Sequence, residues 1–193
     1  MSVLGTAVRL VRRRFAGPPE PVRTAVAGTG DPDERVLAWG ERADGGWLVA
    51  TSRGLCTVVP GAADADPLLP WHQVATARWA ADAAGGGTFS IAALTEVEPG
   101  VQARERAVRH VLRDAGELPA VLRNRVDRTV VTSQRHPLPG GGSVLLVARR
   151  VPGQSVREWS VVFDDAADRN DPVARGVARE RLAAAVAADD PSR

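Results

Sequence analysis

Two short runs of apolar and β-branched residues around a tight turn constrain this chain more than any other feature. The runs extend from Trp47 to Thr51 and from Leu55 to Val59, and the turn between them ends in Gly54. Two such runs separated by a short turn predict a β-hairpin. The segment from Leu69 to Val74 follows, in which a proline and a tryptophan introduce another strand. The chain is therefore predicted to be organised around an antiparallel sheet.

Alternating apolar and polar residues continue on both sides of this hairpin. A strand is predicted from Arg35 to Glu41, and a turn containing Gly45 and Gly46 joins it to the hairpin. Further strands are predicted at 71–80, 88–94, 128–136, 144–148 and 156–164. Hairpin turns at this spacing are typical of sandwiches and barrels.

The hydrophobic period lengthens in the middle and at the end of the chain. The spacing of apolar residues from Val101 to Ala115 fits one helix, and the spacing from Leu118 to Val126 fits another. Asp171 followed by Pro172 is a typical helix start, with an N-cap and a proline at the first helical position. A helical insertion and a C-terminal helix are therefore expected.

Together these elements predict an α+β fold that is mainly antiparallel β. We expect a partly open barrel or a sandwich of about eight strands, with the helical insertion and the C-terminal helix closing it. Residues 34–188 are predicted to form a single domain. Residues 1–33 are predicted to be a basic amphipathic segment followed by a Pro/Gly linker, and residues 189–193 a disordered tail.

The N-terminal segment separates apolar from basic side chains at helical spacing. Its apolar residues are Leu4, Val8, Val11 and Phe15, and its basic residues are Arg9, Arg12, Arg13 and Arg14. This pattern is typical of segments that dock on an anionic membrane surface or in an acidic groove of a partner. The alternatives are a frayed tail and a helix that packs on its own domain.

Composition limits the class of protein. Of the 193 residues, 44% are hydrophobic and 25% charged, as in ordinary globular proteins. The net charge is only +2, and no aromatic residue lies between Phe89 and Trp159, so nucleic-acid binding is not predicted. One cysteine fits a reducing cytoplasm, and no apolar run approaches the ~20 residues of a membrane-spanning helix.

The residues most suited to catalysis or metal binding are few. They are Cys56, His72, His110 and His136. Their spacing matches no metal signature, and a thiol among the apolar residues of a strand usually packs as a small hydrophobic side chain. No metal and no cofactor is therefore predicted, although the fold could still bring Cys56 and a histidine together as a nucleophile and its base.

A resemblance to a known family lies in the first strands. Trp47-Leu-Val-Ala-Thr51, Arg53 and Leu55, followed by Leu69-Pro-Trp71 and Val74, are similar to bacterial pleckstrin-homology-like (PH-like) domains. They also resemble a family of uncharacterised actinobacterial proteins with a PH-like barrel. Gly54 departs from this pattern, because those domains often carry a second basic residue there. The resemblance implies a binding or scaffolding module with no catalytic residues to transfer.

The sequence therefore predicts a non-enzymatic cytoplasmic interaction module that binds a protein partner and leaves its oligomeric state open. One alternative is a peripheral module held at a membrane surface by its N-terminal basic helix. The other is a small enzyme that uses Cys56 or a histidine.

Overall fold

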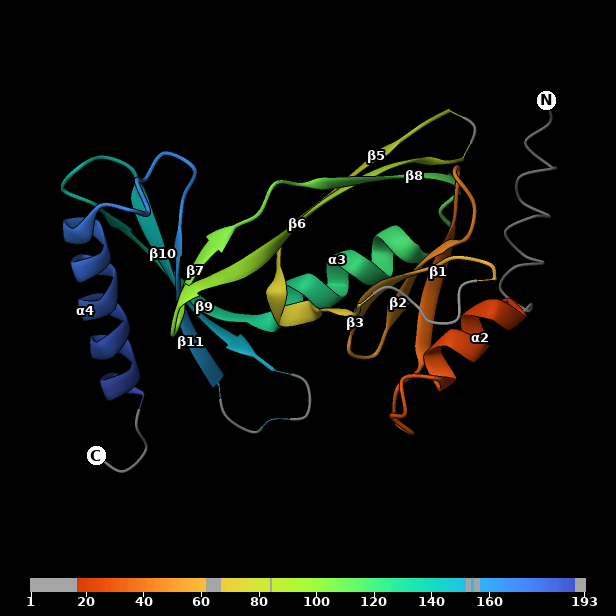
Figure 1. Ribbon diagram of the computed structural model, residues 1–193, viewed down its shortest axis with the longest axis horizontal. Helices are drawn as coiled ribbons and strands as arrows, with labels where there is room; N and C mark the ends of the chain where they lie inside the picture. Colours follow the sequence, from red (N-terminus) through yellow and green to blue (C-terminus); the bar gives the residue numbers. More distant parts are fainter. Residues whose placement is uncertain (1–16, 62–66, 84, 152–153, 155–156, 190–193) are drawn as a thin grey trace. The chain divides into compact units, whose positions relative to one another are not determined.

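The computed structural model describes residues 17–61, 67–83, 85–151, 154 and 157–189 (Figure 1). These residues belong to two compact units. Unit 1 takes its residues from 1–71, 76–91 and 108–125, and unit 2 from 72–75, 92–107 and 126–193. The sequence analysis placed one domain over residues 34–188. Three of the passages between the units lie inside strands or α-helices, namely β5 (Val74–Ala81), β6 (Gly87–Glu98) and α3 (Leu118–Thr129).

Unit 1 is built on the predicted hairpin. Its strands follow the order β4-β3-β2-β1-β8-β6, and β5 pairs with β6. The bounds are β1 Val36–Arg42, β2 Trp47–Thr51, β3 Gly54–Val58, β4 Leu69–Pro70, β5 Val74–Ala81 and β8 Val108–Asp114. The hairpin predicted at residues 47–59 is confirmed as β2 and β3, because Trp47 lies opposite Val58 and Ala50 opposite Leu55.

A helix occupies part of the predicted linker, so the linker prediction is wrong there. Helix α2 (Glu20–Ala27) begins after Pro19, with a proline in its first turn. Its Val22 and Val26 are buried and pack in one core cluster with Val49 of β2. Two buried valines one helical turn apart stabilise this short helix by tertiary contact, which its own sequence would not do.

Trp71 connects the hairpin to the strand that follows. Its ring is buried, and its indole Nε1 donates to the carbonyl of Thr51 at 3.1 Å. The strand predicted to begin at Trp71 therefore starts with a turn of 3-10 helix, Trp71–Gln73, and β5 begins at Val74.

Unit 2 contains a second run of strands with one helix against it. The order is β6-β7-β11-β10-β9, and all pairs are antiparallel except β11 with β7. The bounds are β7 Val101–Arg104, β9 Val130–Pro137, β10 Ser143–Arg150 and β11 Arg157–Phe163. Helix α4 (Pro172–Ala188) packs its Ala174 and Ala178 against the face that carries Val144 and Phe163.

The helix predicted from Val101 to Ala115 is wrong, because this segment forms β7 and β8. Gly100 turns the chain with a φ of 74° and starts β7. Val101 and Ala103 are then buried on one face, which is a period of two. Val108 and Val111, whose spacing suggested a helix, are exposed on β8, where Leu112 is the buried residue.

The other two predicted helices are confirmed. Helix α3 covers the segment predicted at residues 118–126. Helix α4 begins where the sequence places it, because the Asp171 carboxylate accepts from the backbone N–H groups of Val173 and Ala174. The helical insertion therefore consists of one helix.

The coarse fold class is confirmed as α+β with mostly antiparallel pairing. Eleven strands occur among the described residues, where the sequence predicted about eight. In neither unit do the first and last strands of the order pair with each other among these residues, so neither sheet is closed.

Candidate functional site

The N-terminal residues predicted to bind a membrane or a partner lie outside the described residues. They are Leu4, Val8, Arg9, Val11, Arg12, Arg13, Arg14 and Phe15. Their role stays a prediction. No helix of the described part of the chain is long and apolar enough to cross a membrane.

The cysteine and the three histidines that were candidates for catalysis or metal binding are divided between the two units. Cys56 is buried in unit 1, in a core cluster with Val49 and Val58. His72 and His136 belong to unit 2, and His110 lies on β8 of unit 1. Within the described ranges, no three His, Cys, Asp or Glu side chains gather as a metal-binding group.

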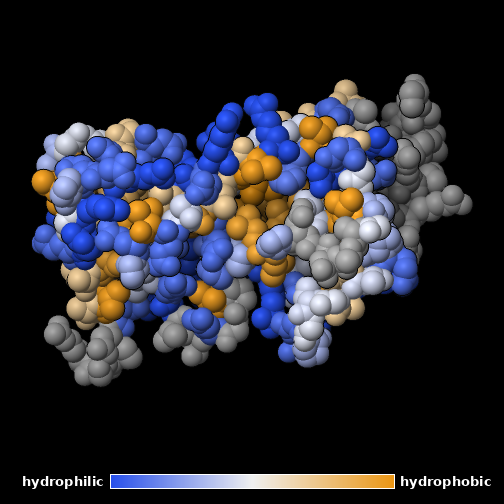
Figure 2. Space-filling model, viewed as in Figure 1, coloured by the Kyte–Doolittle hydropathy of each residue, from blue (hydrophilic) through white to orange (hydrophobic). Residues whose placement is uncertain are grey.

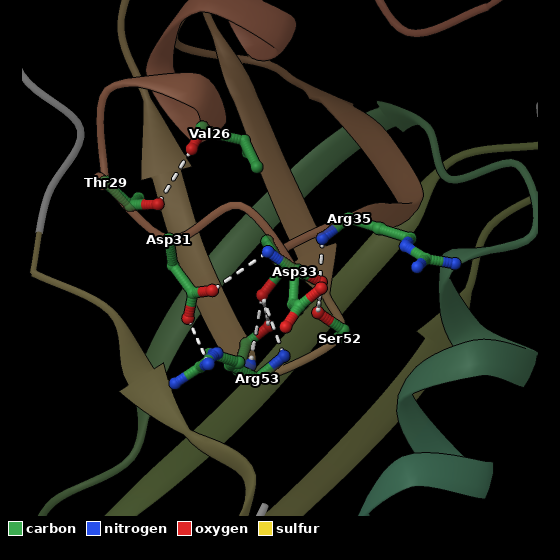
Figure 3. A network of polar contacts seen from close by, with 9 residues as sticks. Val26, Thr29, Asp31, Asp33, Arg35, Ser52 and Arg53 are labelled. Atoms are coloured by element: carbon green, nitrogen blue, oxygen red, sulfur yellow. Dashed lines mark hydrogen bonds and ion pairs between the residues drawn. The ribbon is translucent and has the colours of Figure 1, made fainter. Parts of the chain in front are cut away.

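A groove of about 540 Å³ lies beside α2 in unit 1. Its lining residues are Pro18, Arg23, Val26, Ala27, Gly30, Asp31, Pro32, Glu34 and Val36. Next to it, Asp31 forms an ion pair with Arg53 and accepts from the N–H of Asp33 at 2.9 Å (Figure 3). Ser52 accepts from the N–H of Arg35 at 3.1 Å and donates to the carbonyl of Asp33 at 3.3 Å. These contacts hold the loop after α2 to the β2–β3 turn.

A buried arginine forms a polar cluster in unit 2. Arg149 on β10 is only 7% exposed, and its Nη1 donates to the hydroxyl of Thr129 at 3.2 Å. That hydroxyl in turn donates to the carbonyl of Val126 at 2.7 Å. Burial lowers the pKa of Arg149, and its Nε has no hydrogen-bond partner among the described residues. The cluster ties the end of α3 to β10.

His72 and Glu158 belong to the same electrostatic environment. Glu158 lies directly opposite Arg149 on the neighbouring strand. Burial lowers the pKa of His72, Glu158 opposes this change and Arg149 adds to it. We interpret the cluster as structural because the hydrogen bond from Arg149 to Thr129 joins two elements of the fold.

The edge strand β9 differs from the groove beside α2 and from the Arg149 cluster, because it combines exposed apolar side chains with backbone groups that no described strand pairs with. The large hydrophobic side chains exposed on the described residues are all valines, and Figure 2 shows a mostly hydrophilic face with separate hydrophobic patches. Only Val130 and Val131, each 37% exposed, are neighbours in sequence. They begin β9, in which every side chain as far as Arg135 is exposed.

The hairpin that joins β9 to β10 determines which backbone groups of β9 point outward. The N–H of Leu138 donates to the carbonyl of Gly142 at 3.1 Å. Bonded and non-bonded pairs alternate along an antiparallel ladder, so Gln134 is bonded to β10. Ser133 and Arg135 therefore direct both their N–H and their C=O groups away from β10. We call these two residues the free edge of β9.

The other side of β10 agrees with this assignment. The N–H of Asp164 donates to the carbonyl of Ser143 at 3.0 Å, so odd-numbered residues of β10 bond to β11 and even-numbered ones to β9. No described strand other than β10 pairs with β9.

Irregular residues bound the free edge on both sides. At one end is Pro137, whose backbone nitrogen points away from β10. Because proline has no N–H, no hydrogen bond to β10 is lost there. At the other end the register shifts between Ala148 and Arg149, which leaves Val131 without an opposite residue. The accessible part of the edge is therefore short and defined.

No protein-family model, curated protein or solved structure matches this chain. The candidate site is therefore assigned from the geometry of the described residues alone.

Sequence reasoning found β9 as a strand but missed its position at the edge. The run from Val130 to Ser133 has strong β propensity, yet strand order depends on pairings distant in sequence. Pro137 was the one available signal, because proline in a strand favours an edge position.

Proposed function

We propose that the chain is a non-enzymatic interaction module that binds an extended segment of a protein along the free edge of β9. The observation that carries this proposal is the outward direction of the Ser133 and Arg135 backbone groups beside two exposed valines. Adding a strand to a free sheet edge is a common way to bind a peptide. The PH-like family and a cytoplasmic location are part of the same proposal.

The magnitudes indicate what such a partner must contribute. The free edge offers two donors and two acceptors, and each backbone hydrogen bond contributes about 0.5–1.5 kcal/mol net. Association costs roughly 4–15 kcal/mol. Backbone pairing alone is therefore insufficient, so an apolar side chain of the bound segment must cover Val130 and Val131. We expect weak binding of extended, partly apolar peptides.

Selection from a displayed random peptide library tests the proposal. The purified chain is the bait, and the selected peptides are measured by fluorescence anisotropy against wild type, Ser133→Pro and Ser133→Ala. Proline removes one outward N–H, whereas alanine keeps it and removes only the hydroxyl. We expect the selected peptides to lose about tenfold or more in affinity for Ser133→Pro and to keep their affinity for Ser133→Ala.

Two outcomes would overturn the proposal. One is a selection that yields no peptide above background. The other is a set of peptides that bind wild type and Ser133→Pro equally, which would place their site elsewhere. Circular dichroism of each variant confirms that the comparison is between folded chains.

A further inference from the structure

We infer that the segment which β9 binds is β9 of a second copy of this chain, in a symmetric antiparallel dimer. The inference rests on the proposed function, because it uses the same free edge. It goes further by naming the partner and the register of pairing.

The free edge is complementary to itself in one register. If the two-fold axis passes through Gln134, Ser133 lies opposite Arg135 of the second copy, and Arg135 lies opposite Ser133. Both are bonded positions in an antiparallel pair. All the outward donors and acceptors of both edges are then used, and the two Gln134 side chains face each other at a non-bonded pair.

The irregular ends also match in this register. Pro137, which has no N–H, lies opposite the bulged Val131 of the second copy. Neither residue is required to continue the ladder. The same two features that bound the free edge on one chain therefore fall at the two ends of the shared ladder.

Charge favours this register over the one whose two-fold axis passes through Arg135. Arg135 is the only residue of β9 with a permanent charge. An axis through Arg135 would place the two guanidinium groups directly opposite each other, and like charges at opposite positions are destabilising. With the axis through Gln134, each arginine faces a serine.

Sedimentation velocity over a wide concentration range is the first test. We expect wild type and Ser133→Ala to form a reversible dimer and Ser133→Pro to associate about tenfold or more weakly. Gln134→Lys and Gln134→Asp test the axis while keeping the backbone N–H. Each of these two variants should be more monomeric alone than wild type, and an equimolar mixture of them should recover the dimer.

Disulfide formation tests the register. In a Cys56→Ala background, Gln134→Cys should cross-link two chains quickly, because opposite residues of a non-bonded pair have Cα atoms about 4.5 Å apart. Thr132→Cys in the same background is the control. It lies opposite His136 of the second copy and should cross-link slowly.

The outcomes separate this inference from the proposed function. A wild type that is monomeric at every concentration would overturn the second-copy inference, and the peptide selection would still decide the function. A dimer that persists in Ser133→Pro and Gln134→Lys would overturn the inference by showing another interface. Fast cross-linking of Thr132→Cys in place of Gln134→Cys would overturn the register and with it the inferred antiparallel dimer.

Discussion

The indole Nε1 of Trp159 donates to the carboxylate Oδ2 of Asp189 at 2.8 Å, which joins β11 to the C-cap of α4. Arg157 donates to the other oxygen of the same carboxylate at 2.7 Å. One carboxylate therefore holds two residues of a strand to the end of the helix that covers their sheet.

Asp189→Ala should destabilise unit 2, because it leaves the half-buried Trp159 indole without its acceptor. Loss of such a partner costs about 1–3 kcal/mol. Urea unfolding followed by the helical circular dichroism signal measures the change in the unfolding free energy. Asp165→Ala is the matched control, since its ion pair with Arg104 is exposed and should contribute under about 1 kcal/mol. Equal effects of the two variants would contradict the prediction.

The position of Asp189 illustrates what sequence reasoning could not reach. The tail was predicted to begin at residue 189. Asp189 instead ends the helix, because Trp159 and Arg157, some thirty residues earlier, supply its donors. No local pattern encodes a contact over that separation.

Arg149 and Thr129 should respond in opposite directions to apolar replacement. Arg149→Met removes a buried charge whose Nε has no hydrogen-bond partner among the described residues, so we expect the fold to be unchanged in stability or stabilised. Thr129→Val removes the hydroxyl that accepts from Arg149 and leaves the guanidinium buried, so we expect a loss of about 1–3 kcal/mol. Chemical denaturation of both variants checks this. Two losses of similar size would show that the arginine itself stabilises the fold.

Acidification should weaken the fold through His72. Burial lowers the pKa of His72 from its ordinary value of 6.5, while Glu158 acts to raise it and Arg149 to lower it further. Between the lowered pKa and 6.5 the unfolded chain binds more protons, so the unfolding free energy falls as the pH drops through this window. In His72→Gln this part of the pH dependence should disappear. Denaturation midpoints measured across the window provide the check.

Two further groups sharpen that measurement. Glu158→Gln removes the charge that raises the pKa of His72, so the window should extend to lower pH. Asp164 acts in a separate window, because a hydrogen bond from the Ser143 hydroxyl lowers its pKa from 3.8. Its contribution is present above that value and is lost as the pH falls through the lowered pKa. A pH slope near 6.5 that survives in His72→Gln would contradict the assignment.

The elements that could be predicted from sequence are those fixed by local chemistry. The hairpin of β2 and β3 follows from its apolar runs and the short turn between them, and the start of α4 follows from Asp171 and Pro172. Helix α2 could not be predicted, because its Pro- and Gly-rich flanks resemble a linker and Val22 and Val26 are stabilised by a core cluster of distant strand residues that includes Val49. The free edge of β9 could not be predicted either, because it depends on the order of strands distant in sequence.

Gly46 should tolerate substitution far less than its neighbour Gly45. Both have positive φ angles, 101° at Gly45 and 76° at Gly46. A Cβ at Gly46 would lie 2.2 Å from the backbone oxygen of Val58, whereas a Cβ at Gly45 meets nothing within 4 Å. Gly45→Ala should therefore cost only the strain of an L-residue at positive φ, roughly 1–2 kcal/mol. Gly46→Ala adds a clash with the backbone of β3, which has to move for the variant to fold.

Thermal unfolding of the two variants side by side measures this difference. We expect Gly46→Ala to melt well below Gly45→Ala, with the loss concentrated in unit 1, because the displaced Val58 packs in the core cluster with Val22 and Val49. Trp47 reports on the change directly, since it lies opposite Val58 in the register of β2 and β3. Equal melting temperatures would contradict this prediction. They would mean that the turn between β1 and β2 depends only on its φ angles and that the close approach of Gly46 to β3 does not affect stability.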